Sequence, residues 1–118
     1  MNKLAKRAVA CKHWRWMPGM LDEHGNRYVA EGRYPRRSVL PDLTDPATLG
    51  CLLALVREAW DVGYGENKYA YIAVNPPVTP HMDEPWSVVV CDHNGEWPFG
   101  FDGDTEAEAL IEALEAAP

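Results

Sequence analysis

The chain has 118 residues, of which 47% are apolar and 25% charged, and this composition is typical of one soluble globular domain with a sizeable core. Its three cysteines are far apart and form no CxxC pair, which argues against a disulfide scaffold or a zinc ribbon and favours a reducing setting. The formal net charge is −7, and no stretch approaches the ~20 apolar residues of a membrane span, so we expect a soluble, cytoplasmic protein.

The first forty residues predict an N-terminal arm and a hairpin. Residues 4–11 form either a short helix or a frayed arm. The sequence HWRW at 13–16 alternates polar and aromatic residues, which is typical of a strand. The sequence DEHGN at 22–26 is a good hairpin turn with a glycine available for positive φ. Residues 14–30 are therefore predicted to form a small antiparallel hairpin or meander.

The clearest signal in the chain is an apolar helix that begins at residue 46. Asp45 is a good N-cap, and Pro46 suits the first helical position, where its missing N–H costs nothing. Leucine, valine and tryptophan then recur at helical spacing between residues 49 and 60. Gly63 is a plausible helix stop. Because this helix is so apolar, we predict that other parts of the fold cover it on more than one side.

The remaining chain predicts three strands and a final helix. Aromatic and β-branched residues mark the strands, at 68–74, 86–91 and 96–101. Asn94-Gly95 matches a type I′ hairpin turn, and Pro98 places the third strand at a sheet edge or a bulge. Thr105 and Glu108 have the spacing of a capping box for the last helix.

These elements predict an α+β fold in which a single domain spans residues 1–118. Residues 1–40 would form the N-terminal arm and β-hairpin. Residues 45–118 would form a central helix, a three-stranded antiparallel meander and a C-terminal helix, packed as a two-layer domain. The hairpin is expected to extend the sheet or to cover it.

Charge is unevenly divided along the chain. Residues 1–60 hold ten Lys and Arg against six Asp and Glu, a net charge of +4, whereas residues 61–118 hold one against twelve, a net charge of −11. Such asymmetry is a prompt to look for an anionic ligand at one end and a basic partner at the other. The alternative is that the two halves fold together and neutralise each other.

Aromatic and basic residues gather in the first half of the chain and form the candidate ligand site. Flat rings beside guanidinium groups suit a nucleobase and its phosphates, the rings by stacking and the arginines by bidentate hydrogen bonds. A glycine-rich loop after the central helix adds two further candidates. The predicted ligand-binding residues are Trp14, Arg15, Trp16, Arg33, Tyr34, Arg36, Arg37, Tyr64 and Lys68, with Arg27 and Tyr28 in the same cluster. The competing interpretation places the tryptophans in the core and the arginines on an ordinary surface.

No motif for catalysis or metal binding is present in the sequence. The four histidines fall at strand ends or turns, and pairs such as Cys91-x-His93 supply only two of the three or four ligands that zinc requires. There is no Walker loop, no nucleophile elbow and no Rossmann glycine pattern. We therefore expect no enzyme activity, no metal and no cofactor.

Three segments resemble a group of small proteins encoded by phages and prophages. They are WRWMPGM at 14–20, LPDLTDPATLGCLLALVREAW at 40–60 and GDTEAEALIEALEAAP at 103–118. The resemblance covers both ends of the chain, and the middle segment is quite specific. It implies a phage or prophage origin and an accessory role, and it implies no particular activity.

Two weaker resemblances concern the second half of the chain. The sequence FDGDTEAEAL at 101–110 is similar to the strand and helix of HicB-type antitoxins, although no DNA-binding segment follows residue 118. The order helix, three strands, helix also resembles a double-stranded-RNA-binding domain. The acidic second helix argues against that activity, because phosphate contacts require Lys or Arg.

The leading functional hypothesis is a non-enzymatic phage protein that sequesters a small, anionic, nucleotide-derived immune signal and so blocks host defence. We expect a homo-oligomer, because one small domain has little room for a deep cavity. We expect no membrane partner and no direct nucleic-acid binding. The alternatives are an acidic protein-interaction inhibitor that mimics nucleic acid, of anti-CRISPR or anti-restriction type, and a HicB-like antitoxin.

Overall fold

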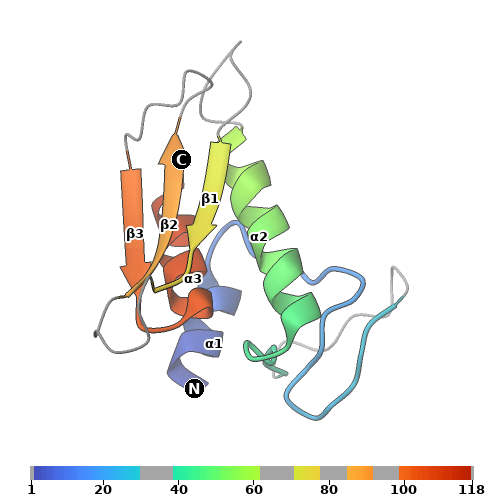
Figure 1. Cartoon of the computed structure of the whole chain (residues 1–118). Coiled ribbons are helices and arrows are strands. Elements are labelled where there is room, and N and C mark those ends of the chain that lie inside the picture. The colour runs from blue at the N-terminus through green and yellow to red at the C-terminus, as the bar shows by residue number, and fades with distance from the viewer. Residues whose placement is uncertain (1, 30–38, 62–70, 78–84, 92–98, 118) are drawn as a thin grey trace.

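The computed structural model describes residues 2–29, 39–61, 71–77, 85–91 and 99–117. In chain order, the elements are α1 (Asn2–Ala10), α2 (Pro46–Asp61), β1 (Tyr71–Asn75), β2 (Trp86–Cys91), β3 (Phe99–Gly103) and α3 (Glu106–Ala116). Figure 1 shows the sheet beside the helices, which confirms the predicted α+β class.

The three strands form the predicted antiparallel meander. Their order in the sheet is β1-β2-β3, so β2 lies in the middle. Val88 of β2 pairs with Val74 of β1 and with Phe101 of β3, and all three residues contribute to the core. Strands β1 and β3 overlap the predicted regions, and the predicted residues 68–70 and 96–98 lie outside the described part of the chain. The predicted Asn94-Gly95 turn and Pro98 lie outside the described residues.

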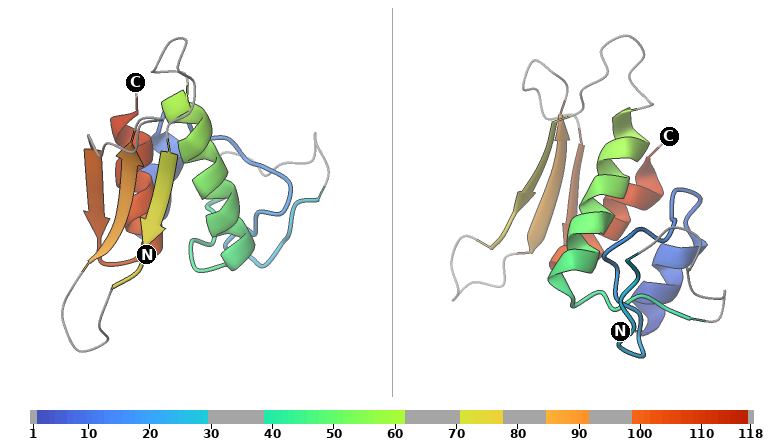
Figure 2. Two further views of the ribbon diagram at one scale, coloured as in Figure 1. Left: turned by 45° about the horizontal axis from the view of Figure 1, so that its top comes forward. Right: turned by 90° about the vertical axis from the view of Figure 1, so that its right-hand side faces the viewer.

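Helices α2 and α3 lie on one face of the sheet, and α1 lies on the far side of α3 (Figure 2). The interior is apolar and is shared between the sheet and the helices. Its fully buried members include Leu52, Leu55 and Val56 of α2, Val88 and Val90 of β2, and Leu110, Ile111 and Leu114 of α3. Trp60 joins the two helices, because its indole Nε1–H donates to the carbonyl oxygen of Ala113 at 2.9 Å. Helix α2 is therefore packed on more than one side, as predicted.

Local signals set the start of α2 as the sequence predicts. The helix begins at Pro46, and Asp45 Oδ2 accepts hydrogen bonds from the backbone N–H and the hydroxyl of Thr48, each at 2.9 Å. The predicted stop at Gly63 lies outside the described residues. The N-cap matters for stability because it satisfies one of the four backbone donors that a helix start leaves without partners.

The start of α3 contains a modified capping box. Thr105 Oγ1 accepts from the Glu108 N–H at 3.1 Å, as predicted. Glu108 Oε2 accepts in return from Asp104 N–H at 3.2 Å, which is one residue earlier than the standard motif. The preceding Gly103 packs against the same turn, since a Cβ atom there would lie 2.5 Å from the backbone nitrogen of Ala109.

The predicted N-terminal hairpin is not formed as a pair of strands. Residues 14–17 have no regular secondary structure, and among the described residues of this region the ladder pairing is limited to the isolated antiparallel bridges Leu21↔Arg27 and Asp22↔Pro41. Backbone bonds join the two sides of the turn, since Tyr28 N–H donates to the Met20 carbonyl oxygen and Asp22 N–H to that of Asn26, each at 2.9 Å. The intervening Leu21 N–H donates to Thr48 Oγ1 of α2 at 2.9 Å. The turn at 22–26 is present, but its flanks do not extend into a sheet.

Helix α1 joins the basic start of the chain to its acidic end. The Arg7 guanidinium contacts Glu112 Oε1 at 2.9 Å and Glu115 Oε1 at 2.5 Å, and both acceptors belong to α3. Ala8 is fully buried, and Cys11 Sγ lies 3.6 Å from the Leu114 carbonyl oxygen. Part of the charge asymmetry is thus neutralised within the fold, as the alternative interpretation of that asymmetry expected.

Candidate functional site

The candidate site contains three aromatic rings in a row and the two arginines next to them in the sequence. We call this set the aromatic–basic surface: Trp14, Arg15, Trp16, Arg27 and Tyr28. The rings of Trp14 and Trp16 meet edge to face, with centroids 5.6 Å apart and planes at 81°. The Tyr28 ring lies 5.5 Å from Trp16 at 60°. Such contacts are favourable for aromatic quadrupoles. The row therefore joins two segments that are separated by a turn in the sequence.

Each of the two tryptophans is partly buried against the core and partly exposed. Both are partly buried and pack against the main core cluster. Within the part of the chain that the structure describes, His13 Nε2 and Trp14 Nε1 are buried without a hydrogen-bond partner. Buried polar atoms are rarely left unpaired, so these adjacent groups mark an unusual place in the fold.

Arg15 stands between the two tryptophans in the sequence and is paired with helix α2. Its Nη1 and Nη2 contact Glu58 Oε2 at 2.7 Å and Oε1 at 3.0 Å, a two-pronged arrangement. Hydrogen bonding from Arg15 holds the pKa of Glu58 below its usual value. Both side chains are 55% exposed, so solvent weakens the attraction between them.

Arg27 is held by the residue that caps α2. Its Nη2 and Nη1 contact Asp45 Oδ1 at 2.9 Å and Oδ2 at 3.0 Å, and Nη1 also donates to the Gly19 carbonyl oxygen at 2.7 Å. These bonds lower the pKa of Asp45, chiefly through Arg27, and raise that of Arg27. Asp45 thereby connects the helix start to the aromatic–basic surface.

Tyr28 is fixed by a buried carboxylate. Its hydroxyl donates to Asp22 Oδ2 at 2.6 Å, which raises the pKa of Tyr28 to about 12. Burial alone would raise the pKa of Asp22, but bonds from Tyr28, Asn26 and His24 outweigh burial and lower it. The ring of Tyr28 is therefore positioned by its hydroxyl as well as by Trp16.

Acid is expected to destabilise this network. A carboxyl whose pKa is lower in the folded state contributes stability that is present above its unfolded pKa, ordinarily 3.8, and is lost as pH falls through the folded value. Asp45→Asn keeps a good N-cap but removes the charge, so it should cost about 1 kcal/mol at neutral pH and flatten the loss of stability below about pH 5. Urea denaturation of both proteins at several pH values measures this.

The control for that experiment is Asp102→Asn, which removes an exposed carboxylate from β3, outside the network. It should leave the free energy of unfolding at neutral pH unchanged. Identical pH dependence in the wild-type protein and Asp45→Asn would contradict the assigned role of Asp45.

The structure places three of the nine predicted ligand-binding residues, and it brings these three together. The rings of Trp14 and Trp16 meet each other and Tyr28, and Arg15, between them in the sequence, pairs with Glu58. The other six, Arg33, Tyr34, Arg36, Arg37, Tyr64 and Lys68, lie in residues 30–38 and 62–70, outside the described part of the chain. The carboxylates of Glu58, Asp45 and Asp22 were not foreseen as partners, because no sequence spacing connects them to the cluster.

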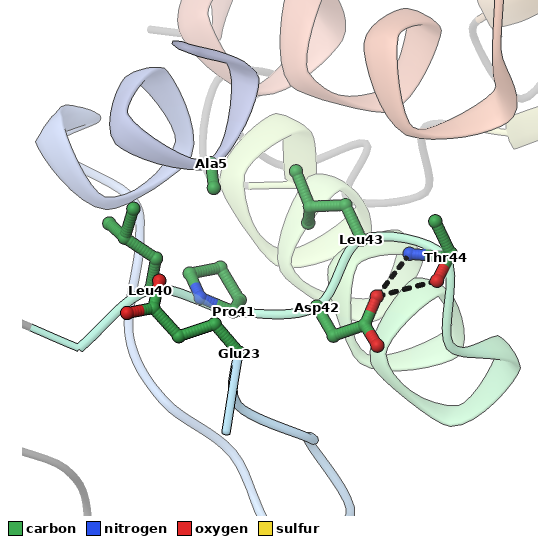
Figure 3. A pocket seen from close by; sticks show the side chains of 7 residues that line it. All are labelled: Ala5, Glu23, Leu40, Pro41, Asp42, Leu43 and Thr44. Atoms are coloured by element: carbon green, nitrogen blue, oxygen red, sulfur yellow. Dashed lines mark hydrogen bonds between the residues drawn. The ribbon is translucent and has the colours of Figure 1, made fainter. Parts of the chain in front are cut away.

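Two hollows are formed by described residues, and neither is lined by Trp14, Arg15 or Trp16. The first, of about 280 Å³, is drawn in Figure 3 and is lined by Ala5, Glu23, Leu40, Pro41, Asp42, Leu43 and Thr44. Its two carboxylates lie at opposite ends, and Asp42 is turned toward Thr44, from which it accepts two hydrogen bonds. The second hollow adjoins it at Leu43 and Thr44.

The described residues form neither a cluster of metal ligands nor a membrane-spanning helix. No group of three or more His, Cys, Asp or Glu side chains there could hold a metal ion. None of the helices there has the length and apolar character needed to cross a bilayer. His81 and His93 lie outside these residues.

Comparison with known proteins found no matching family model, no similar curated protein and no similar solved structure.

Proposed function

We propose that this chain is a non-enzymatic binding protein of phage or prophage origin that captures a small, flat, anionic ligand of nucleotide type. The observation that carries the proposal is the row of rings formed by Trp14, Trp16 and Tyr28, to which Arg15 and Arg27 are adjacent in the sequence. Stacking on such rings is sequence-tolerant and contributes ~1–3 kcal/mol per base, and guanidinium groups supply the phosphate contacts.

The ion pairs of the surface are compatible with an anionic ligand. Arg15 and Glu58 are both more than half exposed, and ion pairs of this kind contribute little net stability, ~0–1 kcal/mol. A phosphate, with more negative charge than a carboxylate, could therefore replace Glu58 as the partner of Arg15. Arg27 is tied to Asp45, whose side chain is only 10% exposed, and would stay in place as a fixed positive group.

The six candidates outside the described residues belong to the segments 30–38 and 62–70. In the sequence, residues 30–38 lie between Tyr28 of the aromatic–basic surface and Leu40, whose carbonyl oxygen accepts from Glu23 N–H at 2.8 Å. Residues 62–70 follow the end of α2, the helix that carries Glu58. We propose that Arg33, Arg36, Arg37 and Lys68 hold phosphate groups, and that Tyr34 and Tyr64 add ring surface.

The biological role proposed is that of an anti-defence sponge in the cytoplasm of an infected bacterium. It rests on the resemblance of 14–20, 40–60 and 103–118 to phage-encoded proteins. A pocket between subunits would enclose the ligand, because one small domain offers limited depth. The nucleic-acid-mimic alternative has less support, since Arg7 neutralises part of the acidic face of α3 through Glu112 and Glu115.

Calorimetric titration with a panel of linear, cyclic and cyclic-di-nucleotides tests the proposal. We expect one class of nucleotide to bind, and the double variant Arg36→Ala/Arg37→Ala to weaken that binding by tenfold or more, on the order expected for lost charge-assisted contacts. The matched control is Lys3→Ala/Lys6→Ala, which removes the same charge from exposed positions of α1 and should bind normally.

Two results would overturn the proposal. The first is no heat with any nucleotide at high protein concentration. The second is an equal effect of both double variants, which would mean that net charge, and not phosphate contacts made by Arg36 and Arg37, drives binding. Light scattering with and without the bound nucleotide measures the proposed oligomer.

A further inference from the structure

The second hollow, of about 320 Å³, lies where the three helices, strand β2 and the turn before α2 meet. Leu4 comes from α1, Leu43 and Thr44 from the turn before α2, Leu49 from α2, and Trp86 from the start of β2. Thr105, Glu106 and Ala107 come from the start of α3. The walls are therefore set by the packing of the whole domain and not by one flexible loop.

The walls are mostly apolar, and most of the side chains that form them pack against the hydrophobic core. Leu4, Leu43, Leu49 and Trp86 are partly buried and pack against the core, while Ala107 is 3% exposed. The small Ala107 side chain leaves room that a larger residue would fill. A hollow of this size lies at the lower end of the range for small-molecule sites, which combine apolar walls with a few polar groups.

The charge at the hollow is negative. Glu106 is the one ionisable residue among the eight that line it, and none of the eight is basic. The Thr105 side chain is held in place by the bond from Glu108 N–H, so the α3 start is an ordered wall. An apolar cation would gain a carboxylate partner from Glu106 and contact with Trp86. Glu106 would repel a carboxylate or phosphate ligand and so oppose the attraction of the α3 N-terminus for anions.

We propose that this hollow binds a small organic cation with an apolar body, of the aryl-alkylamine class. The aromatic body would lie against Leu4, Leu49 and Trp86, and the ammonium group would face Glu106. The hollow shares no residue with the aromatic–basic surface and selects the opposite charge, so this inference stands apart from the proposed nucleotide site.

Three probes of nearly equal shape and different charge test the inference: phenethylamine, 2-phenylethanol and phenylacetate. Protein ¹H–¹⁵N spectra are recorded during titration of each probe. We expect phenethylamine to shift the signals of Leu4, Leu49, Ala107 and the Trp86 indole, with a Kd in the millimolar range, as is usual for so small a ligand. The neutral alcohol should bind about threefold more weakly than phenethylamine, and phenylacetate should bind weakest. The expected differences in affinity are small because they depend on one partly exposed carboxylate, that of Glu106.

Glu106→Gln is the variant that isolates the charge, and Asp104→Asn is its control. Both remove one negative charge from the same end of α3, but Asp104 does not line the hollow. Glu106→Gln should remove the preference for phenethylamine over 2-phenylethanol, and Asp104→Asn should preserve it. Nuclear Overhauser contacts between the phenyl protons and the Leu49 methyl groups should be present.

Three results would overturn the inference. One is the absence of shifts at the lining residues in the millimolar range. Another is phenylacetate binding as well as phenethylamine. The third is a preference for the amine that Glu106→Gln leaves unchanged, which would place the selective group elsewhere.

Discussion

Gly103→Ala is expected to lower the free energy of unfolding by about 3 kcal/mol, at the upper end of the usual cost of overpacking. The added Cβ would lie 2.5 Å from the Ala109 nitrogen and 2.9 Å from the Glu108 carbonyl carbon, both backbone atoms of α3. A side chain could rotate away from such a clash, but the first turn of a capped helix has to move as a unit. Urea denaturation followed by circular dichroism measures the loss.

Gly100→Ala is the matched control for Gly103→Ala. Both glycines lie in β3, but a Cβ atom at Gly100 would meet nothing within 4 Å. Its effect should stay within about 0.5 kcal/mol, as for other uncrowded surface positions. Equal denaturation midpoints for the two variants would show that the β3–α3 junction is not tightly packed.

Trp60→Ala is expected to cost about 4 kcal/mol of stability, which is typical for the loss of a buried tryptophan. Trp60 is 4% exposed, its ring lies 5.8 Å from Phe101, and its indole N–H bonds to Ala113 of α3. The side chain therefore fills space between the helices and the sheet and also satisfies a buried carbonyl group. Thermal and urea unfolding measure the change.

Trp60→Phe separates those two contributions. It keeps an aromatic ring in the core and removes the donor to Ala113, so it should cost about 1–2 kcal/mol, the usual penalty for a buried acceptor left unpaired, and clearly less than Trp60→Ala. If Trp60→Phe were as damaging as Trp60→Ala, the hydrogen bond would outweigh the packing. If neither variant lowered the free energy of unfolding, the described packing of Trp60 between α2 and α3 would be contradicted.

The elements that the sequence predicts well are those whose signals are local. Asp45, next to Pro46, caps the start of α2 by accepting from the N–H of Thr48, three residues later. Thr105 caps α3 in the same way by accepting from the N–H of Glu108. The strand β2 also lies where its β-branched residues predict. In each case the groups that determine the structure are neighbours in the chain.

The N-terminal hairpin was predicted wrongly in part because a distant side chain bonds to its backbone. Alternation at 13–16 is typical of a strand, but the residues that bond across the turn are 19–22 and 26–28. Between them, the Leu21 N–H donates to Thr48 of α2, a partner that satisfies this donor outside any sheet. Nothing in the spacing of the residues shows that Thr48 would lie there.

In the candidate site, too, features set by neighbouring residues are predictable from the sequence, and contacts between distant residues are not. The closeness of Trp14, Trp16 and Tyr28 follows from a turn that the sequence predicts. The pairing of Arg15 with Glu58 spans 43 residues, and the second hollow draws on four separate elements. Composition and periodicity identify the residue types of a site, whereas their partners depend on the tertiary fold.

The contact between α1 and α3 has a consequence for synthesis on the ribosome. Arg7 and Glu115 are 108 residues apart, so α1 lacks this packing surface until the ribosome has also translated the α3 segment. At ~5–20 residues per second, that wait lasts on the order of ten seconds. During this interval the apolar side of the nascent helix, with Leu4 and Ala8, is open to chaperones.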